Sequence, residues 1–251
     1  MDFVKGMDLS LLRELEDRGA VFRLKGMDLF TLMKKCSVNL IRLRLWVNPY
    51  SKRGESYGGG MNDIATTIEL ARRTINAGMS FMLDFHYSDF WADPAKQFKP
   101  KAWKYLEGDA LREQVYEYTK RVLCTLRDEN LIPEFIQIGN EITNGFLWPD
   151  GKFENTETMV SLLRAGIQGA REILPSANLI IHLDYGTDNE MYRKWFKAVE
   201  PYDLDFDVVG MSYYPHWNGS IEKLSENMND ISQQYDKDVM VVETSIAYTL
   251  D

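Results

Sequence analysis

A short apolar stretch in the middle of the chain ends in two polar residues and reads Phe135-Ile136-Gln137-Ile138-Gly139-Asn140-Glu141. Its length and apolar content predict a buried β-strand over residues 134–140. Similar runs predict further strands at 3–7, 39–46, 79–86, 178–184, 206–213 and 238–244. Long amphipathic segments alternate with these runs, and this order predicts parallel strands joined by helical crossovers.

The segments between the runs show the spacing of helices. From Asn62 to Ala77 apolar residues recur every three or four positions, Asn62 can cap the start, and Gly78 follows the end. We expect further helices from about Ala110 to Asp128, up to Leu174 before Pro175, and from about Ser220 onward. No linker, repeat or low-complexity stretch interrupts the chain, so we expect one domain over residues 1–251.

Polar residues gather at the carboxyl ends of the predicted strands. A doubly wound open sheet would spread many of them apart. In a (β/α)8 barrel all strand ends converge on one face, where active sites lie. The gathering of polar residues at so many strand ends therefore favours an α/β barrel of the TIM type. No glycine-rich motif follows the first run, so nucleotide binding has no support. The strand-end residues are Arg42, Arg44, Asp84, His86, Asn140, Glu141, His182, Asp184, Tyr213, Tyr214 and Glu243.

The composition excludes several classes of protein. Hydrophobic residues make up 45% and charged residues 27%, as in a globular domain rather than a disordered chain. A net charge of −9 disfavours binding to nucleic acid or to an anionic membrane. No apolar run reaches the roughly 18 residues of a transmembrane helix, and we expect no signal peptide because residues 1–6 lack a basic region and an apolar region.

Glu141 and Glu243 each close a very apolar run, in the fourth and the seventh of the predicted strands. Two carboxylates that face one cleft can divide labour, one protonated as general acid and the other ionised as nucleophile. Such a pair cleaves a glycosidic bond with retention when the carboxyl groups are about 5–5.5 Å apart. The alternative is that each glutamate caps a helix or pairs with an arginine.

Aromatic residues follow several of the predicted strands on the same face. Flat rings can stack on sugar rings while polar side chains bond the hydroxyl groups. In the other interpretation the rings only pack the loops together, and we expect such a structural role for Trp46 and Trp195. The candidates for sugar contact are Phe90, Trp91, Trp103, Trp148, Tyr213, Tyr214 and Trp217.

The three histidines, His86, His182 and His216, come from separate segments and lack the spacing of a metal site. We therefore expect no metal and no cofactor, and we expect His86 to bond a substrate hydroxyl group or a catalytic carboxylate. No serine lies in a G-x-S-x-G motif, which disfavours a serine hydrolase. Cys36 and Cys124 also lack metal spacing and are expected to be buried free thiols.

Several segments are distinctive when they are taken together. The strongest is Asp84-Phe85-His86-Tyr87-Ser88-Asp89-Phe90-Trp91-Ala92-Asp93-Pro94. The others are Ile41-Arg42-Leu43-Arg44-Leu45-Trp46-Val47-Asn48-Pro49, Gln137-Ile138-Gly139-Asn140-Glu141-Ile142-Thr143-Asn144-Gly145, Trp148-Pro149, Gly210-Met211-Ser212-Tyr213-Tyr214-Pro215 and Val242-Glu243-Thr244-Ser245. In this order they resemble the endo-β-1,4-galactanases of glycoside hydrolase family 53. The resemblance runs from about Gly6 to the last residue.

The resemblance implies a retaining (β/α)8 barrel that acts on β-1,4-galactan, the side chain of type I arabinogalactan, or on galacto-oligosaccharides. It implies Glu141 as acid/base and Glu243 as nucleophile. Arg44 is the best match to the arginine that supports the nucleophile, with Arg42 as the alternative. Because the polymer lies outside cells, an extracellular location is expected. The other substrate-binding residues that we expect are Asn140 at the sugar 2-hydroxyl, Tyr213 beside Glu243, Trp91 and Trp217 as sugar platforms, and Asp84 and His86.

The chain departs from the family's pattern after the seventh strand, because family members continue into an eighth strand and a final helix. We therefore expect an incomplete barrel with free edges beside the first and seventh strands, and such edges are sticky. We expect a second copy, a separately encoded fragment or rearranged termini to cover them. The alternatives to a galactanase are a carbohydrate-binding remnant with impaired catalysis and a related hydrolase of mannan, xylan or β-glucan.

Overall fold

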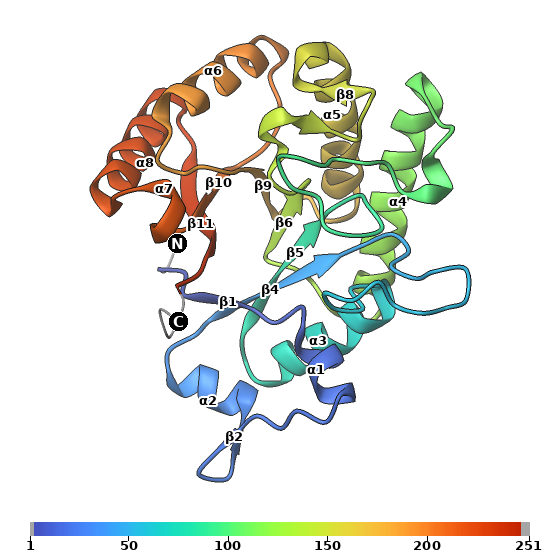
Figure 1. Ribbon diagram of the computed structural model, residues 1–251, viewed down its shortest axis with the longest axis vertical. Coiled ribbons are helices and arrows are strands. Elements are labelled where there is room, and N and C mark those ends of the chain that lie inside the picture. Colours follow the sequence, from blue (N-terminus) through green and yellow to red (C-terminus); the bar gives the residue numbers. More distant parts are fainter. Residues whose placement is uncertain (1–2, 247–251) are drawn as a thin grey trace.

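A computed structural model describes residues 3–246 of the chain. Its centre is a sheet of seven parallel strands with helices packed on its outer face (Figure 1). The strands lie side by side in chain order, as in a (β/α) barrel, which confirms the predicted fold class. They are β1 (Gly6–Asp8), β4 (Leu40–Leu45), β5 (Ser80–Phe85), β6 (Phe135–Ile138), β9 (Asn178–Leu183), β10 (Val208–Tyr213) and β11 (Asp238–Thr244).

Helices connect consecutive strands and cover the sheet from outside (Figure 1). Two small antiparallel hairpins, β2–β3 and β7–β8, lie outside the main sheet. Their strands are β2 (Arg23–Leu24), β3 (Met27–Asp28), β7 (Gly145–Phe146) and β8 (Gly151–Lys152). The α-helices are α1 (Leu12–Asp17), α2 (Leu29–Lys35), α3 (Ile64–Asn76), α4 (Gly108–Asp128), α5 (Thr156–Ile173), α6 (Asn189–Val199), α7 (Pro215–Asn218) and α8 (Ile221–Tyr235). Short 3₁₀ helices span Lys101–Trp103, Ile142–Asn144, Phe153–Asn155 and Glu200–Tyr202.

Capping residues set the helix boundaries. The carboxylate of Asp63 accepts a hydrogen bond from the backbone N–H of Thr66 at 2.8 Å and starts α3. The expectation that Asn62 caps this helix was wrong, because its side chain donates to the carbonyl of Gly59 at 3.0 Å instead. Helix α8 begins after Ser220, as predicted.

Alternation along the strands divides the side chains into two sets. The outward set, which includes Ile41, Leu43 and Leu83, packs against the helices in the main core. The inward set forms a small apolar floor at the amino ends of the strands, made of Leu40, Met82, Phe135, Ile180 and Val208. Above this floor the inward positions are polar, so the polar side chains collect at the carboxyl ends of the strands.

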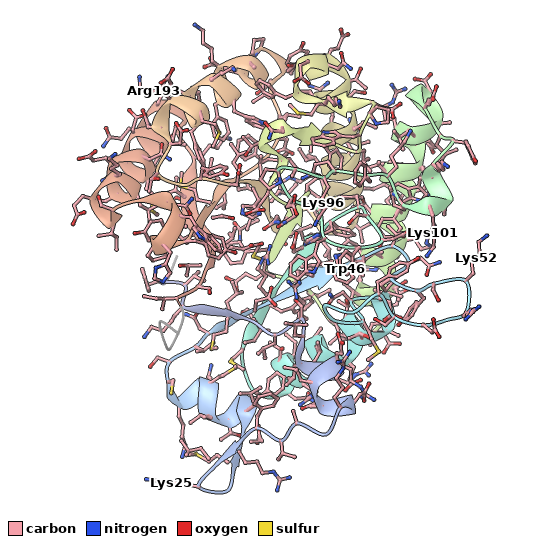
Figure 2. The ribbon with its side chains drawn as sticks, viewed as in Figure 1. Lys25, Trp46, Lys52, Lys96, Lys101 and Arg193 are labelled. Atoms are coloured by element: carbon pink, nitrogen blue, oxygen red, sulfur yellow. The ribbon has the colours of Figure 1, made fainter. Side chains whose placement is uncertain are left out.

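The side chains expected to be structural are inside the molecule. Trp46 and Trp195 are both buried, and Figure 2 shows Trp46 in the interior while Lys25 and Lys52 extend outward from loops. Both cysteines are free, but Cys36 is exposed and Cys124 is half-buried. The expectation of two buried thiols was wrong for Cys36, because it follows the last residue of α2 and that helix presents other side chains to the core.

β1 and β11 are the outer strands of the sheet, and each pairs with one neighbour within residues 3–246. Residues of β11 are half-buried or exposed, whereas every residue of β4, β6 and β10 is buried. A cleft between the outer strands is lined by Val4 and Met7 on one side and by Met240 and Val242 on the other. The predicted incomplete barrel of seven strands is confirmed. None of the described helices has the length and apolar character needed to cross a membrane.

Candidate active site

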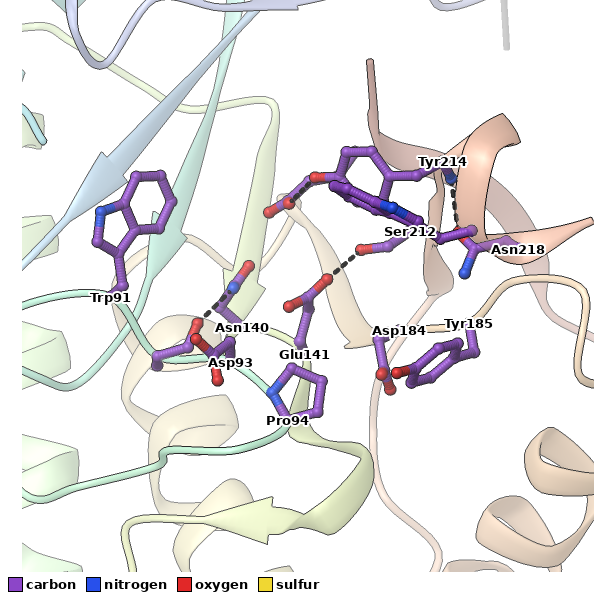
Figure 3. A pocket seen from close by; sticks show the side chains of 13 residues that line it. Trp91, Asp93, Pro94, Asn140, Glu141, Asp184, Tyr185, Ser212, Tyr214 and Asn218 are labelled. Atoms are coloured by element: carbon purple, nitrogen blue, oxygen red, sulfur yellow. Dashed lines mark hydrogen bonds between the residues drawn. The ribbon is translucent and has the colours of Figure 1, made fainter. Parts of the chain in front are cut away.

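The carboxyl ends of the strands surround a cleft of about 360 Å³ (Figure 3). Segments that follow β5, β6, β9 and β10 build its wall together with the end of β11. The two glutamates that the sequence singled out, Glu141 and Glu243, both line this cleft. The other lining residues include Trp91, Asp93, Asn140, Asp184, Ser212, Tyr214 and Trp217.

Glu141 follows β6 in a left-handed backbone conformation, with φ +49° and ψ +53°. Two residues earlier, Gly139 has φ +84°, and a Cβ atom there would lie 2.7 Å from Cγ2 of Ile142. These two positions turn the chain away from the strand and direct Glu141 into the cleft. A left-handed non-glycine residue costs about 1–2 kcal/mol, and strain of this kind is concentrated at functional sites.

The carboxyl group of Glu141 lies in surroundings that favour its protonated form. Burial and the charge of Glu243 raise its pKa to about 8. Asp184 and Asp93 raise this pKa further, while a hydrogen bond from Ser212 Oγ to Oε1, 2.6 Å long, lowers it. At neutral pH this carboxyl group is therefore largely protonated, which is the state required of a general acid.

Glu243 reaches the cleft through an irregularity in β11. Val242 packs against the inner floor and Val241 against the outer core, so strict alternation would point Glu243 outward. Between these positions β11 advances by two residues, from Val241 to Glu243, while β10 advances by one to Ser212. This β-bulge turns Glu243 back to the inner face of the sheet.

The carboxylate of Glu243 has two close hydrogen-bond donors. Arg42 Nη2 donates to Oε1 at 2.6 Å, and the hydroxyl group of Tyr214 donates to Oε2 at 2.9 Å. Burial alone would raise the pKa of Glu243, but the charge of Arg42, together with the hydrogen bond from Tyr214, holds this pKa below its ordinary value. At neutral pH the group is ionised, which is the state required of a nucleophile.

The arginine that contacts Glu243 is Arg42, so the expectation of Arg44 was wrong and the alternative is confirmed for this contact. Both arginines lie on the inner face of β4, but Arg44 is one step nearer the mouth of the barrel. Its guanidinium lies over the ring of Trp91, 3.9 Å from the centroid. Arg42 stays at the level of the buried carboxylates and donates further hydrogen bonds to Asp8 (3.0 Å), Asp84 (2.7 Å) and Asn140 (2.9 Å).

The tyrosine beside Glu243 is Tyr214, so the expectation of Tyr213 was also wrong for this contact. Ser212 points inward from β10, and alternation therefore sends Tyr213 outward into the main core. The hydroxyl group of Tyr213 donates to the carbonyl of Gly219 at 3.1 Å. Tyr214 follows the strand and returns to the cleft.

Asp84 and His86 lie in the interior, beside the cleft rather than in its lining. Asp84 accepts from Arg42, and His86 Nε2 lies 2.9 Å from Asp84 Oδ2. The backbone N–H of Ala92 donates to His86 Nδ1 at 3.1 Å, which leaves the ring proton on Nε2, facing Asp84. Asn140 lines the cleft, and its Nδ2 donates to the carbonyl of Ala92 at 2.8 Å. Its expected bond to a sugar 2-hydroxyl stays a prediction.

The aromatic candidates divide into two groups. Trp91 and Trp217 line the cleft, and 78% of the Trp217 side chain is exposed. Trp103 is buried, with its ring 5.3 Å from that of Tyr118, so of the two interpretations the packing role holds for this residue. Trp148 packs edge-on against Phe98 away from the lining of this cleft.

Three buried polar residues near Glu141 lie outside the predicted set of catalytic and substrate-binding residues, although His182 was noted as a polar residue at a strand end. Ser212 and His182 contact Glu141 directly, and Gln137 Nε2 donates to Asp84 Oδ1 at 2.6 Å. Each occupies an inward position of an otherwise apolar strand, which is the signal that could have found them. His86 and His182 are buried while His216 is exposed, and within residues 3–246 no group of three metal-ligating side chains gathers.

Comparison with known sequences gives a family match over almost the whole chain. A sequence model described as Glycosyl hydrolase family 53 matches residues 4–251. The chain is 39% identical to the endo-beta-1,4-galactanase of Bacillus subtilis (strain 168), covering 100% of this chain and 58% of that protein. It is 36% identical to the arabinogalactan endo-beta-1,4-galactanase A of Aspergillus niger, covering 96% of this chain and 70% of that protein. The chain thus spans about six to seven tenths of the length of these curated relatives.

Solved structures give the same result. The chain is similar to the Ignisphaera aggregans GH53 catalytic domain, with a TM-score of 0.95 and 39% identity over 100% of this chain and 70% of that one. For a structure of fungal beta-1,4-galactanases, the TM-score is 0.89 at 31% identity, over 96% of this chain and 73% of that one. An intracellular xylanase from Thermoanaerobacterium saccharolyticum shares the fold at 14% identity, with a TM-score of 0.64 over 99% of this chain and 76% of that one.

Proposed function

The chain belongs to glycosyl hydrolase family 53, and from this premise we propose that it hydrolyses β-1,4-galactan with retention of the anomeric configuration. The observation that carries the proposal is one cleft with two glutamates whose pKa values are shifted in opposite directions. A retaining glycosidase needs one protonated and one ionised carboxyl group. The names of the galactanase relatives support galactan as the substrate.

In the first half of the proposed reaction, Glu243 attacks the anomeric carbon of the sugar. Glu141 donates its proton to the glycosidic oxygen, the bond from that oxygen to the anomeric carbon breaks, and the leaving chain departs as an alcohol. A galactosyl group is then joined to Glu243 by an ester bond. The Arg42 and Tyr214 hydrogen bonds support this step because they keep Glu243 ionised before the attack.

In the second half, Glu141 acts as a base. It takes a proton from water while the water oxygen bonds to the anomeric carbon and the ester to Glu243 breaks. Two displacements at the same carbon restore the β configuration. We propose that Trp91, Trp217, Asn140 and Arg44 hold the sugar during both steps, since they lie at or beside the cleft. Asp84 and His86 would act from the interior through Arg42.

Sugar release from purified β-1,4-galactan tests this function. We expect the 251-residue chain to release reducing sugar from galactan and much less from mannan, xylan or β-glucan. Nuclear magnetic resonance of the anomeric protons is expected to show the β product first. An α product formed first would contradict retention, and release confined to xylan or mannan would contradict galactan as substrate.

One observation favours a second function, a carbohydrate-binding remnant. The cleft between the outer strands β1 and β11 is lined by Arg42, Tyr214 and Glu243, so that side of the site is bounded by a half-exposed strand. A site with such a wall can hold sugar without the alignment that hydrolysis requires. Calorimetric binding of galactan by a folded chain that releases no reducing sugar would select this function over hydrolysis.

We also propose that residues 1–251 belong to one catalytic domain and that β1 and β11 are covered by further protein in the working enzyme. Met7 of β1 is exposed and β11 is half-buried, which supports such a cover, because exposed apolar edges associate. Light scattering combined with amide exchange tests this. A monomer whose β1 and β11 amides are already well protected would contradict it.

The proposed substrate also suggests where the protein works. Galactan polymers lie outside cells, so we propose an extracellular location. Fractionation of the producing culture checks this, and recovery of the protein only from the cell interior would contradict it.

A further inference from the structure

His182, on β9, lies beneath Glu141 and is completely buried. The backbone N–H of Glu141 donates to its Nδ1 at 3.3 Å. A backbone N–H is always a donor, so Nδ1 carries a lone pair and the ring proton sits on Nε2. Asn140 Oδ1 also lies 3.0 Å from Nδ1, but this oxygen already accepts from Arg42 at 2.9 Å and from Gln137 Nε2 at 3.2 Å, which occupies both of its lone pairs.

The ring proton of His182 determines the direction of the next hydrogen bond. His182 Nε2 lies 2.9 Å from Ser212 Oγ, so the ring donates and the hydroxyl oxygen accepts. A hydroxyl group carries a single hydrogen, and that of Ser212 is then directed to Glu141 Oε1, 2.6 Å away. Oε1 is therefore an acceptor. Ser212 is itself buried, so solvent does not compete for its hydroxyl group.

We propose that His182 and Ser212 are positioning residues that reserve Oε1 of Glu141 as an acceptor and leave Oε2 as the oxygen that carries the acid proton. This inference rests on the proposed role of Glu141 as acid/base. Figure 3 shows Ser212 approaching one carboxyl oxygen while the other points away from it, towards the side of the pocket where Trp91 and Asn140 lie. Within residues 3–246 no side chain or backbone group forms a hydrogen bond with Oε2.

The two positioning residues take part in neither proton transfer. In the first half of the reaction, the proton on Oε2 leaves with the departing alcohol, and the negative charge that develops on Glu141 is stabilised at Oε1 by the hydroxyl group of Ser212. In the second half, Oε2 takes a proton from the attacking water. His182 and Ser212 keep their own protons throughout, so the direction of the hydrogen-bond chain is the same in both halves.

The chain can keep this direction only if His182 stays neutral. Burial, which outweighs the opposing charge of Glu243, lowers the pKa of His182 to about 4. The neutral ring therefore persists over the pH range in which Glu141 titrates. Ser212 is the group that lowers the pKa of Glu141, so removal of its hydroxyl group should raise that pKa. The other titratable groups that face Glu141 are Glu243 from β11, Asp184 after β9, Asp93 after β5 and Tyr214 after β10.

Titration of Glu141 itself tests the proposal without any need for turnover. The ¹³C carboxyl signals of glutamate-labelled protein are followed with pH, and the Glu141 signal is identified by its loss in Glu141→Gln. We expect Ser212→Ala to move the titration midpoint upward by about one pH unit, and Ser212→Thr, which keeps a hydroxyl group, to restore it. Ser80→Ala is the matched control, because it removes a hydroxyl group at the amino end of a strand in the same sheet. An unchanged midpoint in Ser212→Ala would overturn the proposal.

The tautomer of His182 gives a second test on the wild-type chain. ¹⁵N spectra of histidine-labelled protein distinguish a proton on Nε2 from one on Nδ1, and we expect Nε2. A proton on Nδ1 would reverse the chain of donors and overturn the proposal.

Activity separates this proposal from the proposed function. On galactan, Ser212→Ala is expected to lower kcat about tenfold with little change in KM, and Ser212→Thr is expected to recover most of the loss. If Glu141→Gln retained full galactan hydrolysis, the acid/base role itself would fail, whatever the two spectra showed. Correct spectra with an unaltered kcat in Ser212→Ala would show that the hydrogen-bond chain exists but positions nothing.

Discussion

The ends of β6 and β11 each place a glutamate in the same cleft, but the two carboxyl groups have different electrostatic surroundings. Among the described residues, the carboxyl group of Glu141 has one hydrogen-bond partner, the neutral hydroxyl group of Ser212. The carboxylate of Glu243 is held by the guanidinium of Arg42 and the phenol of Tyr214. The pKa of Glu141 is raised to about 8, while that of Glu243 is lowered. The neighbours, rather than the residue type, thus assign the two roles.

The difference arises from one cation on β4. Arg42 extends along the inner face of the sheet and donates to carboxylates on β1, β5 and β11. Within residues 3–246 no lysine or arginine forms an ion pair with Glu141. Two glutamates side by side would repel each other equally, and Arg42 breaks this symmetry by favouring the charge on Glu243.

The largest expected loss of activity follows from removing the carboxylate of Glu243, at the end of β11. Glu243→Gln keeps the size of the side chain but has no nucleophile, so we expect galactan hydrolysis to fall by about 10³-fold or more. Sugar binding measured by calorimetry should persist. The matched control is Glu226→Gln on the exposed face of α8, which should leave the rate unchanged. Substantial hydrolysis by Glu243→Gln would remove the nucleophile assignment.

Removing the carboxyl group of Glu141, at the end of β6, should lower the rate by an amount that depends on the leaving group of the substrate. Glu141→Ala is expected to slow galactan hydrolysis by roughly 10²–10⁴-fold, because the alcohol must then depart without a proton. Aryl galactosides with acidic phenols need no proton and should be affected less, and azide should replace water as the nucleophile and restore part of the rate. An equal loss on both substrates, without azide rescue, would argue against the acid/base role.

Removing the guanidinium group of Arg42 should reduce the difference in pKa between Glu141 and Glu243. In Arg42→Met, burial is left as the main influence on the pKa of Glu243, and this pKa is expected to rise. The acid limb of the pH profile of kcat/KM should therefore move to higher pH. The variant also loses about 3–5 kcal/mol of stability, because it leaves buried carboxylates unpaired. Arg23→Met on the exposed β2 hairpin is the control, and an unmoved acid limb would show that Arg42 does not set the charge of Glu243.

A smaller effect is expected in the pH dependence of stability. Glu141 has a pKa of about 8 in the folded chain against an ordinary value of 4.5, so the folded chain binds more protons between these pH values. The contribution of this group to stability is present below pH 4.5 and is lost as pH rises through 8. Glu141→Gln has no carboxyl group to titrate at this position. Between pH 5 and pH 9 its free energy of unfolding, measured with urea, should therefore fall by roughly 2–4 kcal/mol less than that of the wild type. Identical pH dependence in both proteins would contradict the raised pKa.

The elements of the fold follow closely from the sequence, because hydrophobic runs and helix caps are local signals. All seven strands lie where the apolar runs predict them, and α4 and α8 begin within two residues of the expected positions. The two glutamates were also predicted to share a cleft, since strand ends of a barrel converge. The resemblance of the segments around His86 and Asn140 led to the family that the comparisons show.

The hydrogen-bond partners of the two glutamates were harder to predict. They depend on how far along its strand a side chain lies and on the face of the sheet from which it projects. Arg42 and Arg44 share a face of β4 and differ by two residues, yet only Arg42 lies level with Glu243. Tyr213 and Tyr214 differ by one residue and therefore face opposite ways at the end of β10. The β-bulge that turns Glu243 inward shows no local sequence signal, because the four residues before it, Val239-Met240-Val241-Val242, are all apolar.

The division of labour between the two glutamates is tested most directly by trapping the covalent intermediate. A 2-deoxy-2-fluoro galactoside with a good leaving group forms the glycosyl ester quickly and hydrolyses it slowly, so that mass spectrometry of a protease digest can locate the modified residue. We predict a single modified peptide, with the sugar on Glu243. A sugar attached to Glu141, or an enzyme that hydrolyses galactan but is never labelled, would contradict it.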